Sequence, residues 1–505
     1  FLIFVSFLLF IKENNKLWKW AEAGMGLLAL LGMIFSGTRG SVLGFVAGLG
    51  VAMVSYILIL RDFPKTRKIL GGLVLLGVVL IALLYNFKES AFVQKIPAVN
   101  RAVETSLTAL KNSPRWLAWE SAVASWKEKP VFGWGPNNFF YAFNKYYQPK
   151  SLKFGYGETW FDNAHNILVN TLAVQVLSGL LTYLSVFVIA ALSLVWAKRK
   201  NNLDVHVVVI GLAFLTAHLT QNVTVFENPT SYLYFMFWLA MVNSASHRNE
   251  LGSTIAIKSK NQNIPLNRPI GLGGVLVAGL VILLVIFIFN IKPARANMKA
   301  LEVLKYLSFQ PEAGIELMKS TLAFNSPHID DIRADLSRTA TQILSDESNA
   351  KFNKEKRLEL FQISKEALEK NVVLHPYDIR NYLILSQLGQ VGYALTGDTK
   401  HIADHGRYLD QALLYSPKRQ QIIYNIANFY LQIGKVDESL KLLEKTLAEG
   451  PEVAENYWRL AYVYKLTGNM DKAKEILNLA AKNGIVFNTQ QQEVINQILT
   501  STIQR

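Results

Sequence analysis

Long uncharged runs constrain this chain more than any other feature of its sequence. Up to about Ile291, apolar runs follow one another, each near the roughly 20 residues that a helix needs to cross the hydrocarbon core of a membrane. In lipid every backbone polar group must be bonded internally, so such runs predict helices. Eight spans are predicted, at residues 1–11, 19–36, 40–60, 69–87, 166–197, 205–226, 229–246 and 269–291. Charged residues become frequent after Ile291, so we expect a membrane domain over 1–291 and a second domain over 292–505.

The start of the chain and its composition narrow the classes of protein further. Phe1 lies inside an apolar run that lacks the basic start and cleavage site of a signal peptide, so we interpret this run as a truncated span and expect earlier spans to be missing. The chain has no cysteine, which excludes disulfides, cysteine–zinc sites and a cysteine nucleophile. The formal net charge of +15 fits nucleic acid or anionic lipid, and the many spans favour lipid and argue against nucleic acid.

Short basic loops predict the orientation of the spans. Such loops lie at residues 12–19, 61–68, 198–200 and 248–268. If every span crosses once, all four loops fall on one side, which the positive-inside rule assigns to the cytoplasm. The outer side then carries residues 37–39, the long loop 88–165 and everything after Ile291.

The C-terminal part repeats with a period of 34 residues. Residues that match at this offset are Ala427 with Ala461, Tyr430 with Tyr464, Gly434 with Gly468, and Pro417 with Pro451. The period and these small and aromatic positions resemble tetratricopeptide repeats, which are helix–turn–helix units. We predict an all-α protein: a polytopic membrane helix bundle followed by an α-solenoid from about 296 to 500, with its clearest repeats at 418–486. Such repeats usually bind peptides or partner proteins; a helical bundle without a ligand is the alternative.

Two arginines are predicted at helix starts on the outer side. Thr38 can cap a helix that begins near Arg39, and Ser113 with Pro114 can begin a helix that carries Arg115 in its first turn. A helix start offers free N–H groups and positive charge, so each is a candidate anion site, and the planar fork of arginine suits phosphate. Alternatively, Arg39 is an interfacial charge that flanks a span, and Arg115 is a solvated loop charge.

His165 lies in the sequence WFDNAHNILVN, at the mouth of the fifth predicted span. With Asp162 as the N-cap, His165 falls at the third helical position, where the positive helix end favours neutral imidazole. Neutral imidazole can take a proton from a hydroxyl, so we hypothesise that His165 is a general base while the two arginines hold a phosphate or pyrophosphate. Alternatively, His165 has a capping or structural role. Glu158, Asp162 or Glu227 could orient it.

Two further patterns have a structural and a functional interpretation. Trp116, Trp119 and Trp126 recur at helical spacing, which favours an amphipathic helix at the membrane interface over sugar stacking. In the sixth span His218 shares a face with Gln221 and Asn222. Helix–helix hydrogen bonding is the favoured interpretation of that face, although an ionisable group in a span can also face a cavity.

The order of three motifs resembles the O-antigen ligase family, with the related O-antigen polymerases and pilin-type O-oligosaccharyltransferases. SGTRG opens a span, PRWLAWESAVASWKEKPVFGWGPNNF lies in the long outer loop, and DNAHNILVN opens the next span. Arg39 is followed by ten residues and Gly50, a spacing known among the polymerases. The resemblance covers about residues 20–245.

The resemblance implies a metal-independent glycosyltransferase of the C-type superfamily in the bacterial cytoplasmic membrane, without a cofactor. Its donor would be an undecaprenyl-pyrophosphate-linked glycan and its acceptor a hydroxyl of a lipid, glycan or protein. Arg39 and Arg115 would bind the pyrophosphate, with Arg101 as a rival of Arg115, and His165 would be the base. The repeats, which the basic ligase lacks, would contact a protein acceptor or partner. A membrane-anchored scaffold for envelope assembly and a lipid-linked sugar transporter are the alternatives.

Overall fold

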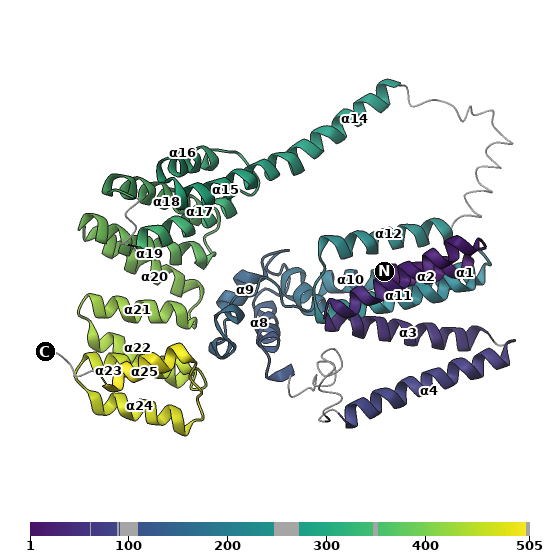
Figure 1. Cartoon of the computed structure of the whole chain (residues 1–505), viewed down its shortest axis with the longest axis horizontal. Helices are drawn as coiled ribbons and strands as arrows, with labels where there is room; N and C mark the ends of the chain where they lie inside the picture. The colour runs from purple at the N-terminus through teal and green to yellow at the C-terminus, as the bar shows by residue number, and fades with distance from the viewer. Residues whose placement is uncertain (61, 88–89, 91–109, 247–271, 347–351, 501–505) are drawn as a thin grey trace. The chain divides into compact units, whose positions relative to one another are not determined.

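The computed structural model describes residues 1–60, 62–87, 90, 110–246, 272–346 and 352–500 (Figure 1). The chain divides into two compact units. The first comprises Phe1–Phe143 and Phe161–Ile264, and the second comprises Asn144–Trp160 and Pro265–Arg505. The described residues contain helices and no strand, which confirms the predicted all-α class. The predicted domain boundary at 291 stays a prediction.

The first unit is a bundle of long apolar helices with a shorter polar part. Its helices are α1 (Leu2–Lys12), α2 (Lys16–Phe35), α3 (Arg39–Ile59), α4 (Pro64–Asn86), α8 (Pro114–Glu128), α9 (Phe139–Lys145, which continues into the second unit), α10 (Ile167–Arg199), α11 (Val205–Thr224) and α12 (Pro229–Ser246).

Six described helices are long and apolar enough to cross a membrane. They are α2, α3, α4, α10, α11 and the helix Leu276–Phe309. These six correspond to six of the eight predicted spans. The other two predicted spans, 1–11 and 229–246, are the helices α1 and α12, which are not among the six.

Three glycines on one face of α3 let it approach α11 closely. Gly40, Gly44 and Gly48 recur every four residues, and a Cβ at these positions would collide with Thr224, with the carbonyl oxygen of Ala217 and with that of Ala213. Small residues at this spacing allow close backbone packing between membrane helices, where apolar surface alone gives little attraction. Gly50, the glycine of the spacing motif, has open space around its Cβ position.

We expect Gly44→Ala to lower the melting temperature of the detergent-solubilised protein, at a cost of about 1–3 kcal/mol for forcing a methyl group into a packed contact. Gly50→Ala is the matched control in the same helix. It should be neutral or slightly stabilising, because alanine suits a helix interior better than glycine by roughly 0.5–1 kcal/mol. Equal melting temperatures for the two variants would contradict the close approach of α3 to α11.

The second unit begins with a long apolar helix that runs on into the repeats. α14 (Leu272–Ile286), a π-helical turn (Phe287–Ile291) and α15 (Lys292–Phe309) follow one another without a break (Figure 1). The remaining helices are α16 (Pro311–Leu322), α17 (Ile329–Ser345), α18 (Lys354–Leu374), α19 (Ile379–Thr396), α20 (Lys400–Tyr415), α21 (Gln420–Gln432), α22 (Val436–Glu449), α23 (Ala454–Leu466), α24 (Met470–Lys482) and α25 (Thr489–Thr500).

The 34-residue period appears directly in the helix boundaries. α21 and α23 start 34 residues apart, as do α22 and α24. Gly434 and Gly468, which match at this offset, both have positive φ, at 76° and 78°. Glycine adopts this conformation without a Cβ penalty, so it suits the turn between the two helices of each repeat. The predicted solenoid of tetratricopeptide repeats is therefore confirmed.

The second unit also contains part of the long loop between the predicted spans. Residues 144–160, which we call the docked segment, pack against the repeats. Its short 3-10 helices are η1 (Pro149–Phe154) and η2 (Tyr156–Thr159). Leu152 of η1 is 2% exposed and belongs to the same hydrophobic core as Tyr424 and Tyr457 of the repeats. No local pattern in the sequence predicts this packing.

Candidate active site

The two predicted arginine-bearing helix starts adjoin the same residue, Thr224, the last residue of α11. α3 starts at Arg39, and the next residue, Gly40, packs directly against the Thr224 hydroxyl. α8 starts at Pro114, and Arg115 donates a hydrogen bond from Nη1 to the Thr224 carbonyl oxygen at 3.0 Å. Both arginine side chains are exposed. The end of α11 therefore brings together two residues that are far apart in the sequence.

The helix start at Arg115 forms as predicted. Ser113 is the N-cap of α8, and its hydroxyl accepts a hydrogen bond from the Trp116 N–H at 3.3 Å. Thr38 is the N-cap of α3, but its side chain makes no capping hydrogen bond. Within the described part of the chain no partner of the Arg39 side chain is found, and Arg39 is exposed, so its guanidinium can bind an anion.

His165 lies outside α10, contrary to the prediction that it is the third residue of a helix capped by Asp162. The N-cap is Asn166, whose side-chain oxygen accepts from the N–H groups of Leu168 and Val169 at 3.0 and 3.3 Å. Asp162 is exposed. Asparagine and aspartate are both good caps, so the composition of DNAHN did not identify the helix start.

The turn before α10 holds His165 in a left-handed backbone conformation, with φ of 50°. This conformation is uncommon for residues other than glycine, although histidine, asparagine and aspartate adopt it several times more often than the rest, and its strain costs on the order of 1 kcal/mol. Hydrogen bonds stabilise the turn: the His165 N–H donates to Asn163 Oδ1 at 3.1 Å, and the Ala164 N–H donates to Asn170 Oδ1 at 3.3 Å.

Aromatic rings and α8 surround the His165 turn. The imidazole lies edge-on to Phe161 and Phe226, with ring centroids 5.4 and 5.2 Å away. Trp119 of α8 donates from its indole nitrogen to the Ala164 carbonyl oxygen at 2.8 Å. Phe226 lies two residues after Thr224. Residues 224–226, which we call the α11 turn, thus contact Arg115, His165 and Gly40, the residue after Arg39.

The tryptophans of α8 do not form its buried face. That face consists of Leu117, Ala118, Ser121, Ala122 and Ser125. Trp116 and Trp119 are half-buried beside it, and their rings lie 5.9 Å apart. The placement of this helix at a membrane interface stays a prediction. The hydrogen bond from Trp119 to Ala164 also stabilises the chain next to His165.

The turn KPVFGWGPNNFF packs into a kink of α10. Val176 has φ of 58° and ψ of −167°, which interrupts the helix. The carbonyl oxygens of Ala173 and Val174 accept hydrogen bonds from the N–H groups of Trp134 and Gly135 at 3.3 and 2.9 Å. A Cβ at Gly133, whose φ is 66°, would lie 2.6 Å from the Val174 oxygen. The turn therefore supplies backbone partners at the break in α10.

The kink separates two environments along α10. With 33 residues, α10 is about 50 Å long, which exceeds the roughly 30 Å hydrocarbon core. Before the kink, Thr171, Ala173 and Val174 are buried, whereas after it Leu177 and Leu181 are more than half exposed. One face of this later part stays buried, with Phe187, Ala190 and Leu194. The exposed apolar face beside it is typical of a helix with one side against protein and the other against lipid.

Ser178 and Gly179 follow the kink within three residues, and a Cβ at Gly179 would collide with the Gln175 Cβ. A serine–glycine pair is a known site of helix kinks, so it was the signal in the sequence.

Glu227 is hydrogen-bonded to His218, although it was one of three candidates to orient His165. His218 Nε2 lies 2.8 Å from Glu227 Oε1, and Asn222 and Ser231 donate to the same carboxylate at 2.5 and 2.7 Å. Burial opposes ionisation of Glu227, but the hydrogen bonds from His218, Ser231 and Asn222 outweigh it and lower the pKa of this carboxyl group. Asn222 also donates to the Tyr183 hydroxyl of α10 at 3.1 Å, so part of this face bonds to another helix, as the favoured interpretation expects. His218 and Gln221 also line a cavity, so the alternative interpretation applies to the same face.

The other candidate supporting residues lie elsewhere. Glu158 belongs to the docked segment of the second unit. Arg101, the rival of Arg115, lies outside the described residues.

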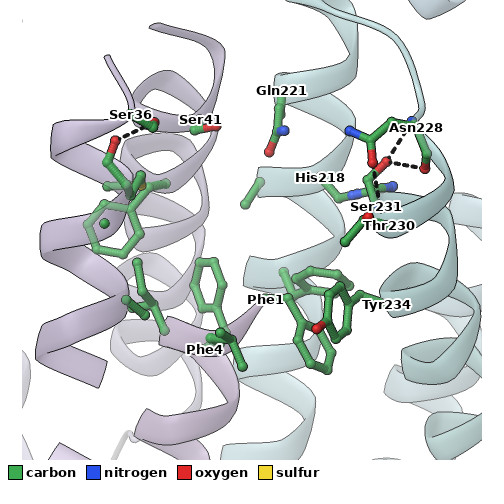
Figure 2. Close-up of a pocket in the computed structure, with 18 of the residues that line it drawn as sticks. Phe1, Phe4, Ser36, Ser41, His218, Gln221, Asn228, Thr230, Ser231 and Tyr234 are labelled. Carbon is green, nitrogen blue, oxygen red and sulfur yellow. Dashed lines mark hydrogen bonds between the residues drawn. The ribbon is translucent and has the colours of Figure 1, made fainter. Parts of the chain in front are cut away.

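A cavity of about 920 Å³ lies between α1, α2, α3, α11 and α12. Figure 2 shows Ser36, Ser41, Gln221 and Ser231 toward one end and the rings of Phe1, Phe4 and Tyr234 toward the other. Ser36 and Ser41 flank the turn that contains Arg39. The cavity therefore has a polar end beside one of the two arginines and an apolar end that could hold a hydrocarbon chain.

Comparison with known proteins identifies two regions. Residues 24–175 match a family described as O-Antigen ligase, and residues 406–461 and 454–482 match tetratricopeptide repeat families. An uncharacterized protein of Haemophilus influenzae is 23% identical over 256 residues, which cover 48% of this chain and 61% of that protein. The chain thus covers less than two thirds of this relative. The crystal structure of the MamA protein covers 41% of this chain and 97% of its own, with 16% identity and a TM-score of 0.27.

The matched ligase region contains Arg39, Arg115 and His165 and ends one residue before the kink at Val176. This chain is therefore similar to the O-antigen ligases over the part that holds the candidate site, and it carries tetratricopeptide repeats after it.

Proposed function

We propose that the protein transfers a glycan from an undecaprenyl-pyrophosphate carrier to an acceptor hydroxyl at the outer face of the bacterial cytoplasmic membrane. The observation that carries the proposal is that one turn, residues 224–226, contacts Arg115, His165 and the start of α3, where Arg39 lies. The O-antigen ligase match over the same residues supports a ligase or polymerase type of reaction.

The arginines would bind the pyrophosphate. Arg39 and Arg115 both lie in the first turn of a helix, where free N–H groups and the helix dipole add to the guanidinium charge. Arg115 uses Nη1 to hold the Thr224 carbonyl, and its remaining donors can reach phosphate oxygens. The polar end of the cavity adjoins Arg39, so the apolar part of the carrier can extend into the cavity.

His165 would take the proton of the acceptor hydroxyl. The oxygen then attacks the anomeric carbon, a new glycosidic C–O bond forms, and the C–O bond to the pyrophosphate breaks. The arginines stabilise the charge that develops on the departing pyrophosphate. A single displacement inverts the anomeric carbon. The imidazole keeps the proton until it is released to solvent.

The repeats would bind a protein acceptor or an assembly partner on the periplasmic or extracellular side. The acceptor can be a lipid, a glycan or a protein, and the chemistry at His165 is the same for each. A scaffold or a lipid-linked sugar transporter would use the same membrane helices, but neither needs a base.

Arg39→Ala and Arg115→Ala should each lower transfer by about 10²–10³-fold, the usual effect of removing one donor to developing negative charge. The measurement is glycan transfer by the full-length protein in membranes, with lipid-linked glycan as the donor. The lysine variants should restore only part of the activity, because lysine lacks the planar fork.

Arg199→Ala, at the far end of α10, is the matched control and should transfer at the wild-type rate. If the two site variants behave like Arg199→Ala, the pyrophosphate is bound elsewhere. If the wild-type protein itself transfers no glycan, the scaffold and transporter alternatives gain support.

A further inference from the structure

The docked segment is held by a buried arginine of the repeats. Arg419 has a fully buried side chain. Its Nη1 donates to the Thr159 carbonyl oxygen and its Nη2 donates to Asn144 Oδ1, both at 2.7 Å. Asn144 and Thr159 stand at the two ends of the docked segment. One guanidinium therefore closes the segment into a loop.

No described carboxylate pairs with Arg419. Its charge is instead stabilised by the two oxygen acceptors, by Ser416 Oγ at 3.3 Å from Nε, and by the rings of Tyr147 and Trp160 at 4.4 and 4.0 Å. Burial lowers the pKa of Arg419 to about 10, so it remains protonated at neutral pH. Both Nη atoms depend on the segment for partners, and a buried donor without a partner is costly.

Further contacts run along the whole segment. Gln420 donates to the Pro149 carbonyl oxygen and Gln421 donates to Thr159 Oγ1, each at 2.8 Å. Ser416 Oγ donates to the Asn144 carbonyl oxygen at 2.7 Å. The side chains of Leu152 and Tyr147 are at most 2% exposed. The repeat surface around α21 is thus complementary to this particular stretch of chain.

We propose that the repeats serve as an internal receptor for the docked segment and that Arg419, as a positioning residue, thereby orders the chain that enters the His165 turn. Trp160, which stacks on Arg419, is five residues before His165. The docking rests on contacts within the second unit alone. Its effect on catalysis rests in addition on the function proposed above.

The absence of cysteine allows a direct test of docking. A Cβ built on Gly450 lies 3.4 Å from the Pro149 Cβ, close to the roughly 3.5–4.5 Å separation of a disulfide. In the full-length protein, Pro149→Cys with Gly450→Cys should form a disulfide, detected as thiols that a maleimide reagent labels only after reduction. Pro149→Cys with Leu466→Cys, at the other end of α23, is the control and should stay reduced. Failure of the first pair to oxidise would overturn the proposal.

The effect on transfer is tested in the same protein. Arg419→Ala should lower transfer at least about tenfold, because small displacements of a catalytic group reduce rates strongly. Adding the Pro149→Cys/Gly450→Cys disulfide should restore transfer, and reduction should remove it again. Because a disulfide also stabilises the fold, thermal unfolding is measured in the oxidised and reduced states, and a role in folding alone would leave the transfer rate per folded protein unchanged by reduction. Asn144→Ala, which leaves the repeats unchanged, should give a smaller loss.

Each result has one meaning. If Arg419→Ala transfers like the wild type, or if the disulfide forms without restoring transfer, the positioning role is wrong. If the wild type transfers no glycan, the proposed function fails, whereas docking is still decided by the disulfide.

Discussion

His165→Ala is expected to lower glycan transfer by about 10²–10⁴-fold, the range for loss of a general base, while the protein still inserts and folds. The expectation follows from the position of the ring. It packs edge-on against Phe161 and Phe226, at the α11 turn that Arg115 and Gly40, the residue after Arg39, contact. The measurement is initial transfer rate in membranes at matched protein level.

Two further variants separate chemistry from backbone conformation. His165 has positive φ, which asparagine tolerates better than alanine does. His165→Asn therefore preserves the turn and removes only the base, and its loss of transfer should match that of His165→Ala. His206→Gln is the control, because His206 contacts Tyr56 at the opposite end of α11. Its transfer rate should be unchanged.

Full activity of His165→Asn would assign the histidine a structural role. The left-handed turn would then be the important feature, and the scaffold and transporter alternatives would gain support. Loss of activity in His165→Ala alone would give the same answer, because alanine changes the backbone preference as well as the side chain.

Periodic features of the sequence predicted the fold well. The apolar runs and the 34-residue repeat depend on patterns that extend over many residues, and the helix boundaries follow them. The start of α8 was also predictable, because serine and proline at 113 and 114 have distinct roles at a helix start.

Features set by tertiary contacts were not predictable. Asp162 and Asn166 are both suitable N-caps of α10. In the structure Asn166 is the cap, because its side chain accepts hydrogen bonds from backbone N–H groups of the first turn. Glu227 is hydrogen-bonded to His218. The sequence positions of Glu227, His218 and His165 did not show which of the two histidines would be its partner.

The docking of residues 144–160 depends on hydrogen bonds between residues more than 250 positions apart, such as Arg419 and Asn144. No local sequence pattern predicts such a contact.

Gly133→Ala is expected to have the second large effect. The substitution places a Cβ 2.6 Å from the Val174 carbonyl oxygen at a residue with positive φ. The clash and the backbone strain together should cost at least about 2 kcal/mol. They should also weaken the hydrogen bonds of Trp134 and Gly135 to α10. We expect a lower melting temperature and, because α10 carries the His165 turn at its start, a lower transfer rate.

Gly434→Ala isolates the strain from the clash. Gly434 also has positive φ, but its Cβ position is open, so the variant should lose only the roughly 1 kcal/mol of a left-handed alanine and should keep its transfer rate. Both proteins are measured by thermal unfolding in detergent and by the same transfer assay. If Gly133→Ala is no more affected than Gly434→Ala, the turn does not brace α10, and the kink at Val176 is maintained by other contacts. If Gly133→Ala loses transfer far beyond its loss of folded protein, the turn sets the position of His165 through α10.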